Sequence, residues 1–291
     1  MASRMAEAST RPLYGFSDAQ LAELPTIYAG TLYAGRTVLV SGGGSGLGRA
    51  TAFLLARLGA HVVVAGRSRE KLESAVAAMA QQGLKADWRQ VDIRQAESVA
   101  ALFTGLAAEG IVPDMLVNSA GGQFPQAAID FSEKGWATVQ STNLDGTWRM
   151  MQAAARAWRD AGTGGRIINI VVVVQQGLYG IAHSVAARAG VIGLSQNLAV
   201  EWAPLGIQIN CIAPGVIETA GWNVYDETAV ATYPKSNPMM RCGTAWDVAE
   251  ACAFLGSPAG GFITGELLHI AGGGQLWGQT WTIEKPGYFS G

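Results

Sequence analysis

Residues 41–48 read SGGGSGLG, and this stretch is the strongest indication of the fold in the chain. It follows an apolar, β-branched run that ends at Val40 and precedes a helix-like stretch that begins near Arg49. Glycines let the backbone turn tightly and approach a ligand closely, and the start of a helix offers unpaired N–H groups and the positive end of the helix dipole. A strand, a glycine-rich turn and a helix in this order therefore predict a dinucleotide-binding site.

The composition fits one compact domain. The chain has 291 residues, of which 49% are hydrophobic, so it can bury a large core. Its 38 glycines follow no strict period and lie among apolar segments, as turns and close packing positions do. The net charge of −2 gives no electrostatic case for a nucleic acid or an anionic membrane as partner.

The cysteines and the hydropathy pattern indicate an intracellular setting. Cys211, Cys242 and Cys252 show no C-x-x-C spacing and stand in apolar surroundings, so we expect reduced, buried thiols. No apolar run approaches the roughly twenty residues that cross a bilayer, and residues 1–10 lack the apolar region of a signal peptide. We expect a soluble, cytoplasmic protein and predict no metal site.

Short β-branched runs alternate with longer helical patterns along the chain. Strands are expected at residues 37–41, 61–65, 86–91, 115–118, 166–171, 207–212 and 267–271. Helices are expected at residues 47–58, 69–82, 96–109, 133–160, 185–203 and 245–255. This alternation predicts an α/β fold: a single-domain, Rossmann-type, doubly wound parallel sheet of seven strands with helices on both faces. Such a sheet binds its ligand beyond the carboxyl ends of the strands.

Three segments stand apart from this pattern. Residues 1–35 are expected to be an N-terminal extension lying on the domain, which itself spans residues 36–275. The long irregular stretch at 215–241 is expected to be a lid or binding loop. The tail at 276–291 is too aromatic to be idle exposed chain, so it is expected to pack on a neighbouring subunit or to help close the substrate pocket.

The end of the second expected strand indicates which dinucleotide binds. Gly66 and Arg67 stand there, where an Asp or Glu would accept hydrogen bonds from the ribose hydroxyls and repel a 2′-phosphate. An arginine instead pairs with that phosphate, which favours NADP(H) over NAD(H). In the alternative reading Arg67 is a solvated residue that opens the next helix, with Arg69 and Lys71 close by.

The spacing G-x-x-x-G-x-G of Gly42, Gly46 and Gly48 resembles the short-chain dehydrogenase/reductase family. This resemblance places the carboxylate of Asp92 at the adenine amino group, the segment NSAGG at 118–122 under the adenosine half, and residues 214–219 at the nicotinamide carboxamide. For Asn118 a helix-cap or turn role is an alternative. The cofactor-binding residues so implied are Ser41, Gly42, Ser45, Gly46, Leu47, Gly48, Arg67, Asp92, Ile93, Asn118, Ala120, Gly121, Arg188, Pro214, Gly215, Ile217 and Thr219.

The catalytic positions depart from the common pattern of that family. Ordinary members use Ser, Tyr and Lys in the arrangement S-x12-Y-x-x-x-K, with an upstream Asn. Here Val171, Ser184 and Arg188 occupy those positions and only Asn143 remains. A serine does not replace a tyrosine as acid or base, and an arginine does not release a proton at working pH. The standard mechanism of a ketone reductase is therefore disfavoured.

Four further segments resemble the peroxisomal trans-2-enoyl-CoA reductase branch, in which Ser and Arg also replace Tyr and Lys. They are GGQFP at 121–125, KGW at 134–136, TNLDGT at 142–147 and HSVAARAGV at 183–191. The resemblance implies NADPH-dependent reduction of the carbon–carbon double bond of an enoyl thioester, with an acyl-CoA as a candidate small-molecule substrate. In that reaction stabilising the enolate oxygen matters more than a strong acid at the carbonyl.

The sequence also offers candidate residues for the proton transfer and for contacts with the substrate. Tyr179 and His183, just before the expected helix that carries Ser184, are candidate proton donors. Alternatively Tyr179 packs under the lid, His183 caps the helix, and water supplies the proton. Candidate substrate contacts are Gln123, Phe124 and Trp222.

Two other functions stay open at this point. The first is an NADP-dependent alcohol dehydrogenase or carbonyl reductase in which Tyr179 replaces the missing tyrosine. The second is a non-catalytic regulatory protein that binds NADP(H). The family resemblance also implies a homotetramer or homodimer, and the terminal FSG is not a peroxisomal address.

Overall fold

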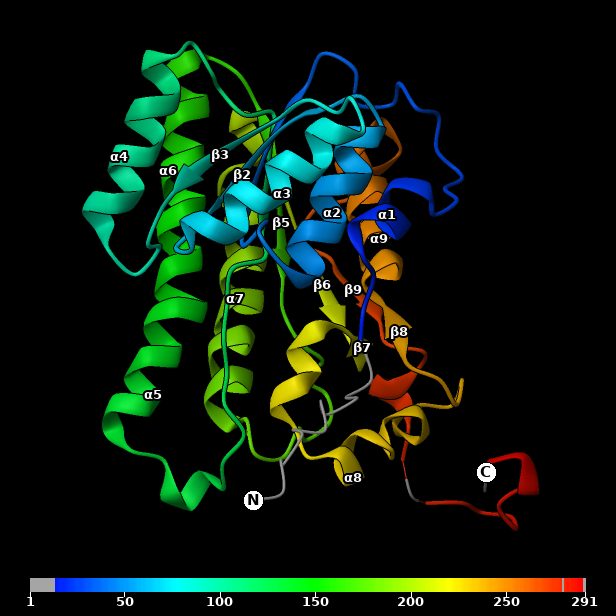
Figure 1. The fold of residues 1–291 in the computed structure, drawn as a ribbon. Coiled ribbons are helices and arrows are strands. Elements are labelled where there is room, and N and C mark those ends of the chain that lie inside the picture. The colour runs from blue at the N-terminus through cyan, green and yellow to red at the C-terminus, as the bar shows by residue number, and fades with distance from the viewer. Residues whose placement is uncertain (1–13, 279, 290–291) are drawn as a thin grey trace, which may run out of the picture.

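A seven-stranded sheet forms the centre of the molecule (Figure 1). The structure is a computed structural model that describes residues 14–278 and 280–289. The strands lie in the order β3-β2-β1-β4-β5-β6-β9, and neighbouring strands are parallel. Their bounds are β1 Thr37–Ser41, β2 His61–Gly66, β3 Ala86–Gln90, β4 Met115–Asn118, β5 Gly165–Ile170, β6 Ile207–Pro214 and β9 Leu267–Ile270. The predicted single-domain, doubly wound sheet is confirmed.

Helices cover both faces of this sheet because the side chains of each buried strand alternate between two cores. Val38 and Val40 of β1 join the core formed with α2, α3 and α9. Leu39, between them, joins the opposite core formed with α4, α6 and α7. The helices are α2 Gly46–Arg57, α3 Arg69–Gln81, α4 Ala96–Ala108, α6 Gly146–Ala161, α7 Ala182–Glu201 and α9 Ala245–Gly256.

The predicted helix at 133–160 is interrupted. Helix α5 Glu133–Gln140 leads into a π-helical turn, Ser141–Asp145, and α6 follows directly. One unbroken α-helix was therefore the wrong prediction, because a locally widened turn hardly disturbs the spacing of apolar residues. Such turns occur frequently at functional sites, and this one holds Asn143.

The predicted lid loop at 215–241 contains short elements of its own. Strand β7 Ile217–Glu218 pairs in parallel with β8 Gly243–Thr244, which lies just before α9. Helix α8 Glu227–Val230 begins at Asp226, whose carboxylate accepts hydrogen bonds from the N–H groups of the first turn. These elements give the loop a defined shape beyond the edge of the sheet (Figure 1).

The two ends of the chain meet the domain differently. In the N-terminal extension, α1 Asp18–Glu23 packs beside α2, and Leu21 is buried in the core. The C-terminal tail stands away from the body (Figure 1), with the rings of Trp277, Trp281 and Phe289 packed on one another. The predictions made for residues 1–13, 279 and 290–291 lie outside the described residues.

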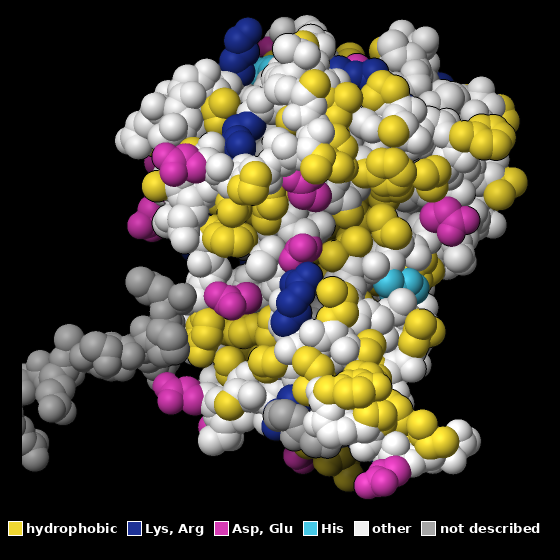
Figure 2. All heavy atoms as spheres, turned by 90° about the vertical axis from the view of Figure 1, so that its right-hand side faces the viewer, with side chains coloured by type: hydrophobic (Ala, Val, Ile, Leu, Met, Phe, Trp, Pro, Cys, Tyr) yellow, Lys and Arg dark blue, Asp and Glu magenta, His cyan; other side chains and the backbone are white. Residues whose placement is uncertain are grey.

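The surface and the thiols add two observations. In the face shown in Figure 2, acidic and basic side chains are interspersed among apolar and uncharged ones. Within the part of the chain that the structure describes, no helix has the length and apolarity to span a membrane.

Cys211 and Cys252 are buried free thiols, whereas Cys242 is half-buried. Burial raises the pKa of Cys211 to about 11 and that of Cys252 to about 12.

Candidate active site

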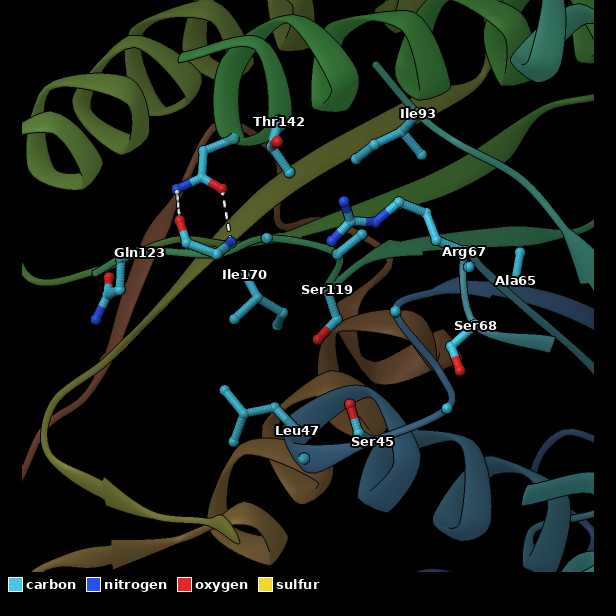
Figure 3. A pocket seen from close by; sticks show the side chains of 18 of the residues that line it. Ser45, Leu47, Ala65, Arg67, Ser68, Ile93, Ser119, Gln123, Thr142 and Ile170 are labelled. Atoms are coloured by element: carbon cyan, nitrogen blue, oxygen red, sulfur yellow. Dashed lines mark hydrogen bonds between the residues drawn. The ribbon is translucent and has the colours of Figure 1, made fainter. Parts of the chain in front are cut away.

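A cavity of about 500 Å³ lies at the carboxyl ends of the central strands. The turn after β1 forms one side of it, with Ser45 and Leu47, and Thr142 lies opposite (Figure 3). The segments that follow β2, β3, β4 and β5, the π-helical turn and the first turns of α7 complete the wall. The predicted residues in this wall are Gly42, Ser45, Gly46, Leu47, Arg67, Asp92, Ile93, Ala120, Gly121, Gln123, Asn143, Ser184 and Arg188. Open α/β sheets bind their ligands at this edge.

The glycine turn brings backbone close to backbone. Gly42 has a φ of +75°, and a Cβ atom at this position would lie 2.6 Å from the backbone nitrogen of Ala120. A Cβ atom at Gly48 would collide with the backbone of Gly42. Only glycine fits both positions. Because neither position carries a side chain, a ligand can approach the main chain of the turn closely.

The start of α2 faces the same cavity with free donors. Its N-cap residue Ser45 makes no side-chain cap hydrogen bond, and Ser45, Gly46 and Leu47 all line the cavity. The first N–H groups of a helix have no partner within the helix. These groups and the helix dipole suit the negative charge of a phosphate group.

Positive charge gathers where β2 passes into α3. Arg67, Ser68 and Lys71 line the cavity there, with Arg67 and Ser68 on one side of it in Figure 3. The carbonyl oxygen of Arg67 accepts a hydrogen bond of 2.9 Å from the side chain of Gln90, which fixes the main chain at this point. Two cations and a hydroxyl group can bind a phosphate group. Ser68 and Lys71 were not predicted from the sequence to belong to the site, although their place at the N-cap and in the first turn of α3 is a usable signal.

Asp92 lies across from these cations and is already paired. Its carboxylate accepts hydrogen bonds from the guanidinium of Arg94 at 2.5–3.1 Å and from the backbone N–H of Arg94 at 3.0 Å. The bonds to the Arg94 side chain, and the charge of Arg67, hold the pKa of Asp92 below its ordinary value. The carboxylate is therefore ionised at neutral pH and kept in one orientation at the cavity wall.

Arg188 is a buried cation with spare hydrogen-bonding capacity. Its Nη2 atom donates to the carbonyl oxygen of Ala120 at 3.4 Å, whereas Nη1 is buried and has no partner among the described residues. Burial lowers the pKa of Arg188 to about 10, so the side chain still carries its charge at neutral pH. An unpaired buried N–H group is costly. A ligand oxygen at this wall would give it a partner.

Asn143 fixes the position of Ser184. The Oδ1 atom of Asn143 accepts from the N–H of Gly122, and its Nδ2 atom donates to the carbonyl oxygen of Gly122, both at 3.0 Å (Figure 3). The same Nδ2 atom donates to Oγ of Ser184 at 3.2 Å. Because Oγ already accepts a hydrogen bond, its own hydrogen is left to point at an acceptor in the cavity.

Some predicted cofactor residues lie beneath the cavity wall rather than in it. Oγ of Ser41 donates to Oδ1 of Asn118 at 3.3 Å, and Nδ2 of Asn118 donates to Asn169 at 2.9 Å. All three side chains are buried in the sheet. Ser41 and Asn118 thus support the turn from below, so their side chains do not face a ligand directly.

The segment after β6 lies outside the cavity wall in this structure. A Cβ atom at Gly215 would collide with Ala271, so this glycine is required for packing. Trp222 is buried against the rings of Tyr14 and Tyr233. The residues of this segment predicted from the sequence but absent from the wall are Pro214, Gly215, Ile217, Thr219 and Trp222.

The two predicted proton donors are not brought to the cavity. The side chain of Tyr179 is 98% exposed. His183 lies inside α7, whose first residue is Ala182, and is fully buried between the rings of Phe124 and Phe131. Its Nδ1 atom accepts from the backbone N–H of Ser184. In this structure Tyr179 faces solvent, and the rings of His183 and Phe124 pack on each other outside the residues that line the cavity.

Comparison with known proteins gives the class of protein. A family model described as enoyl-(acyl carrier protein) reductase matches residues 42–275. A protein of Bacillus subtilis (strain 168) with the name "Probable 2,4-dienoyl-CoA reductase" is 36% identical over 246 residues, which are 83% of this chain and 97% of that protein. A 3-oxoacyl-acyl-carrier-protein reductase of Vibrio cholerae is also 36% identical, over 82% of this chain and 97% of its own.

A solved structure agrees with these matches. The citronellol catabolism dehydrogenase of Pseudomonas aeruginosa PAO1 superimposes with a TM-score of 0.76 and 36% identity, over 86% of this chain and 99% of that chain. The chain therefore belongs to the short-chain dehydrogenase/reductase family and is an oxidoreductase that uses a nicotinamide cofactor.

Proposed function

We propose that the protein is an NADPH-dependent reductase of the carbon–carbon double bond of an α,β-unsaturated (enoyl) thioester. The observation that carries this proposal is the pair formed by Ser184 and Arg188 in the cavity wall. These two residues occupy the positions where ordinary members of the family hold the acid tyrosine and its lysine. The name of the Bacillus subtilis relative and the description of the matching family model agree with such a reaction.

The residues at the cavity fit a dinucleotide with an extra phosphate group. The thin turn at Gly42 and Gly48 and the free start of α2 would hold the pyrophosphate. Arg67 and Lys71 would hold the 2′-phosphate of NADP. When bound, the cofactor supplies a hydride.

The chain's own residues would stabilise the charge that develops on the substrate. Addition of a hydride at the β-carbon puts negative charge on the thioester oxygen, which becomes an enolate. Oγ of Ser184, oriented by Asn143, donates a hydrogen bond to that oxygen, and the guanidinium of Arg188 supplies positive charge beside it. Neither group has to give up a proton. The α-carbon takes its proton from solvent, because Tyr179 and His183 both lie outside the wall.

This reaction differs from carbonyl reduction in one essential requirement. A ketone reduced by hydride needs an acid that transfers a proton to its oxygen. The serine hydroxyl has too high a pKa for this task, and Arg188 keeps its proton at working pH. The exposed position of Tyr179 counts against the displaced acid on which the carbonyl alternative depends.

Steady-state oxidation of NADPH by the purified protein tests the proposal. Crotonyl-CoA, a long-chain trans-2-enoyl-CoA and a panel of ketones and aldehydes are compared under the same conditions. We expect turnover with the enoyl thioesters alone. Turnover with carbonyl compounds alone would contradict the proposal, and tight binding of NADPH without any turnover would favour a regulatory protein.

A further inference from the structure

A second cavity, of about 350 Å³, lies under the lid loop. Trp222, Tyr225 and Val230 of the loop form its apolar wall, together with Tyr14. Tyr14 lies in the N-terminal extension, outside the matched residues 42–275. The extension therefore adds to this cavity a ring that the matched part of the chain does not supply.

Tyr14 is held in place by contacts on both sides. Its ring centroid lies 5.3 Å from that of Trp222, and the backbone N–H of the next residue, Gly15, donates to Oε1 of Glu218 at 3.1 Å. Further along, Asp18 forms a two-bonded ion pair with Arg49 of α2, at 2.6 Å and 2.7 Å. These contacts fasten residues 14–18 as a strap between the lid and the helix that follows the glycine turn.

One hydrogen bond joins the linings of the two cavities. The side-chain nitrogen of Gln123, in the wall of the first cavity, donates to the hydroxyl oxygen of Tyr225, in the wall of the second, at 3.1 Å. Gln123 directly follows Gly122, whose backbone N–H donates a hydrogen bond to the side chain of Asn143. The linings of the two cavities therefore touch at Gln123 and Tyr225.

The lining of the second cavity is mixed. Three aromatic rings and a valine offer surface to an apolar chain, and Asn223, Asp226, Glu227 and Thr228 complete the lining. Asp226 and Glu227 line the same cavity and would repel a phosphate or carboxylate group. Asp226 is tied by its carboxylate to Thr228 and the N–H of Ala229, so it stays ionised as the cap of α8.

We infer that the second cavity holds the acyl chain of the substrate and that Tyr14 is a specificity-determining residue for chain length. This inference rests on the proposed function, since the reacting thioester lies beside Ser184 in the first cavity. The phosphate-bearing carrier stays outside the second cavity because of its negative charge. A short acyl group does not reach Tyr14, whereas a long one packs against it.

Chain-length profiles of Tyr14→Ala and Tyr14→Phe test this assignment. We expect kcat/KM of Tyr14→Ala to fall about tenfold for trans-2-decenoyl-CoA while its value for crotonyl-CoA stays within about twofold of the wild-type value. Tyr14→Phe keeps the ring and should behave like the wild type with both substrates. Equal losses for both substrates, or no loss with the long one, would overturn the inference.

A binding measurement separates this inference from the proposed function. Decanol carries an apolar chain without any reacting group, so its dissociation constant by calorimetry, in the presence of NADPH, requires no turnover. We expect about tenfold weaker binding to Tyr14→Ala than to the wild type and to Tyr14→Phe. If enoyl thioesters are not reduced but this difference is found, the cavity assignment stands and the proposed reaction fails. Equal affinities of all three proteins would refute the assignment itself.

Discussion

Ser184 and Arg188 decide the chemistry at the scale of single residues. The family position of a titrating tyrosine holds a serine hydroxyl, which can donate a hydrogen bond but does not give up its proton at working pH, and the position of its lysine holds a cation that keeps its proton. Both residues line the cavity. In the proposed function the pair stabilises an anion and does not transfer a proton to it.

Replacement of Ser184 by alanine measures the contribution of this donor. Loss of one hydrogen bond to a developing oxyanion lowers kcat by about 100-fold, and we expect a loss of that order for Ser184→Ala with crotonyl-CoA. The dissociation constant of NADPH should stay within about twofold, because the first helical turn and the cations after β2 are untouched. An unchanged kcat would show that Ser184 does not act on the substrate oxygen.

In the proposed function the choice of NADP over NAD depends on Arg67. A glutamate at this position would repel the 2′-phosphate, so Arg67→Glu should raise KM for NADPH about tenfold or more and change KM for NADH little. Arg69→Glu is a matched control, because Arg69 pairs with Glu73 on the exposed side of α3 and does not line the cavity. Equal effects of both substitutions would show that the selectivity comes only from overall charge.

The elements around the site show what the sequence can and cannot predict. The five inner strands were predicted nearly as observed, because their apolar runs are largely buried and end at clear breaks. The edge strands β3 and β9 are only partly buried, and their place between helical patterns indicated them. The π-helical turn at Asn143 was missed, since the apolar spacing runs through it. The direction of Tyr179 was also missed, because the packing of distant segments, and not local sequence, decides whether a loop side chain faces a cavity or solvent.

The turn between β1 and α2 contains a backbone position, Gly42, that a residue with a side chain cannot occupy without strain. An alanine at Gly42 would combine a φ of +75° with a close contact to the backbone of Ala120, so Gly42→Ala should destabilise the fold by roughly 2 kcal/mol or more and weaken cofactor binding. Denaturant unfolding and NADPH titration measure both effects.

Gly105→Ala serves as the matched control for this prediction. Gly105 lies within α4, has an ordinary backbone conformation, and has nothing within 4 Å of an added Cβ atom. The substitution should therefore raise stability by about 0.5–1 kcal/mol. Similar losses of stability in both variants would contradict the account of the turn.

Buried groups make the stability of the whole molecule depend on alkaline pH. Burial raises the pKa values of Cys211, Cys252 and Tyr33 above their ordinary values of 9.0 for the thiols and 10.0 for the phenol. As pH rises, the unfolded chain therefore loses these protons first. The stabilising effect is fully present below the unfolded pKa values and is lost as pH rises toward the folded ones.

Thermal unfolding near about pH 8 and about pH 10 tests this dependence. We expect Tm to fall over that interval, and to fall less in Cys252→Ala, which lacks the thiol whose pKa burial raises to about 12. Cys242→Ala, at a half-buried position, should keep a slope closer to that of the wild type. A slope that is identical in all three proteins would show that buried thiols do not govern the alkaline limit.

In the proposed function the hydride goes to a carbon of the double bond and not to a carbonyl carbon. The most direct measurement is mass spectrometry of the products formed with deuterated NADPH when crotonyl-CoA and acetoacetyl-CoA compete in one reaction. The account predicts butyryl-CoA labelled at the β-carbon and no labelled hydroxybutyryl-CoA. Labelled hydroxybutyryl-CoA as the main product would contradict it.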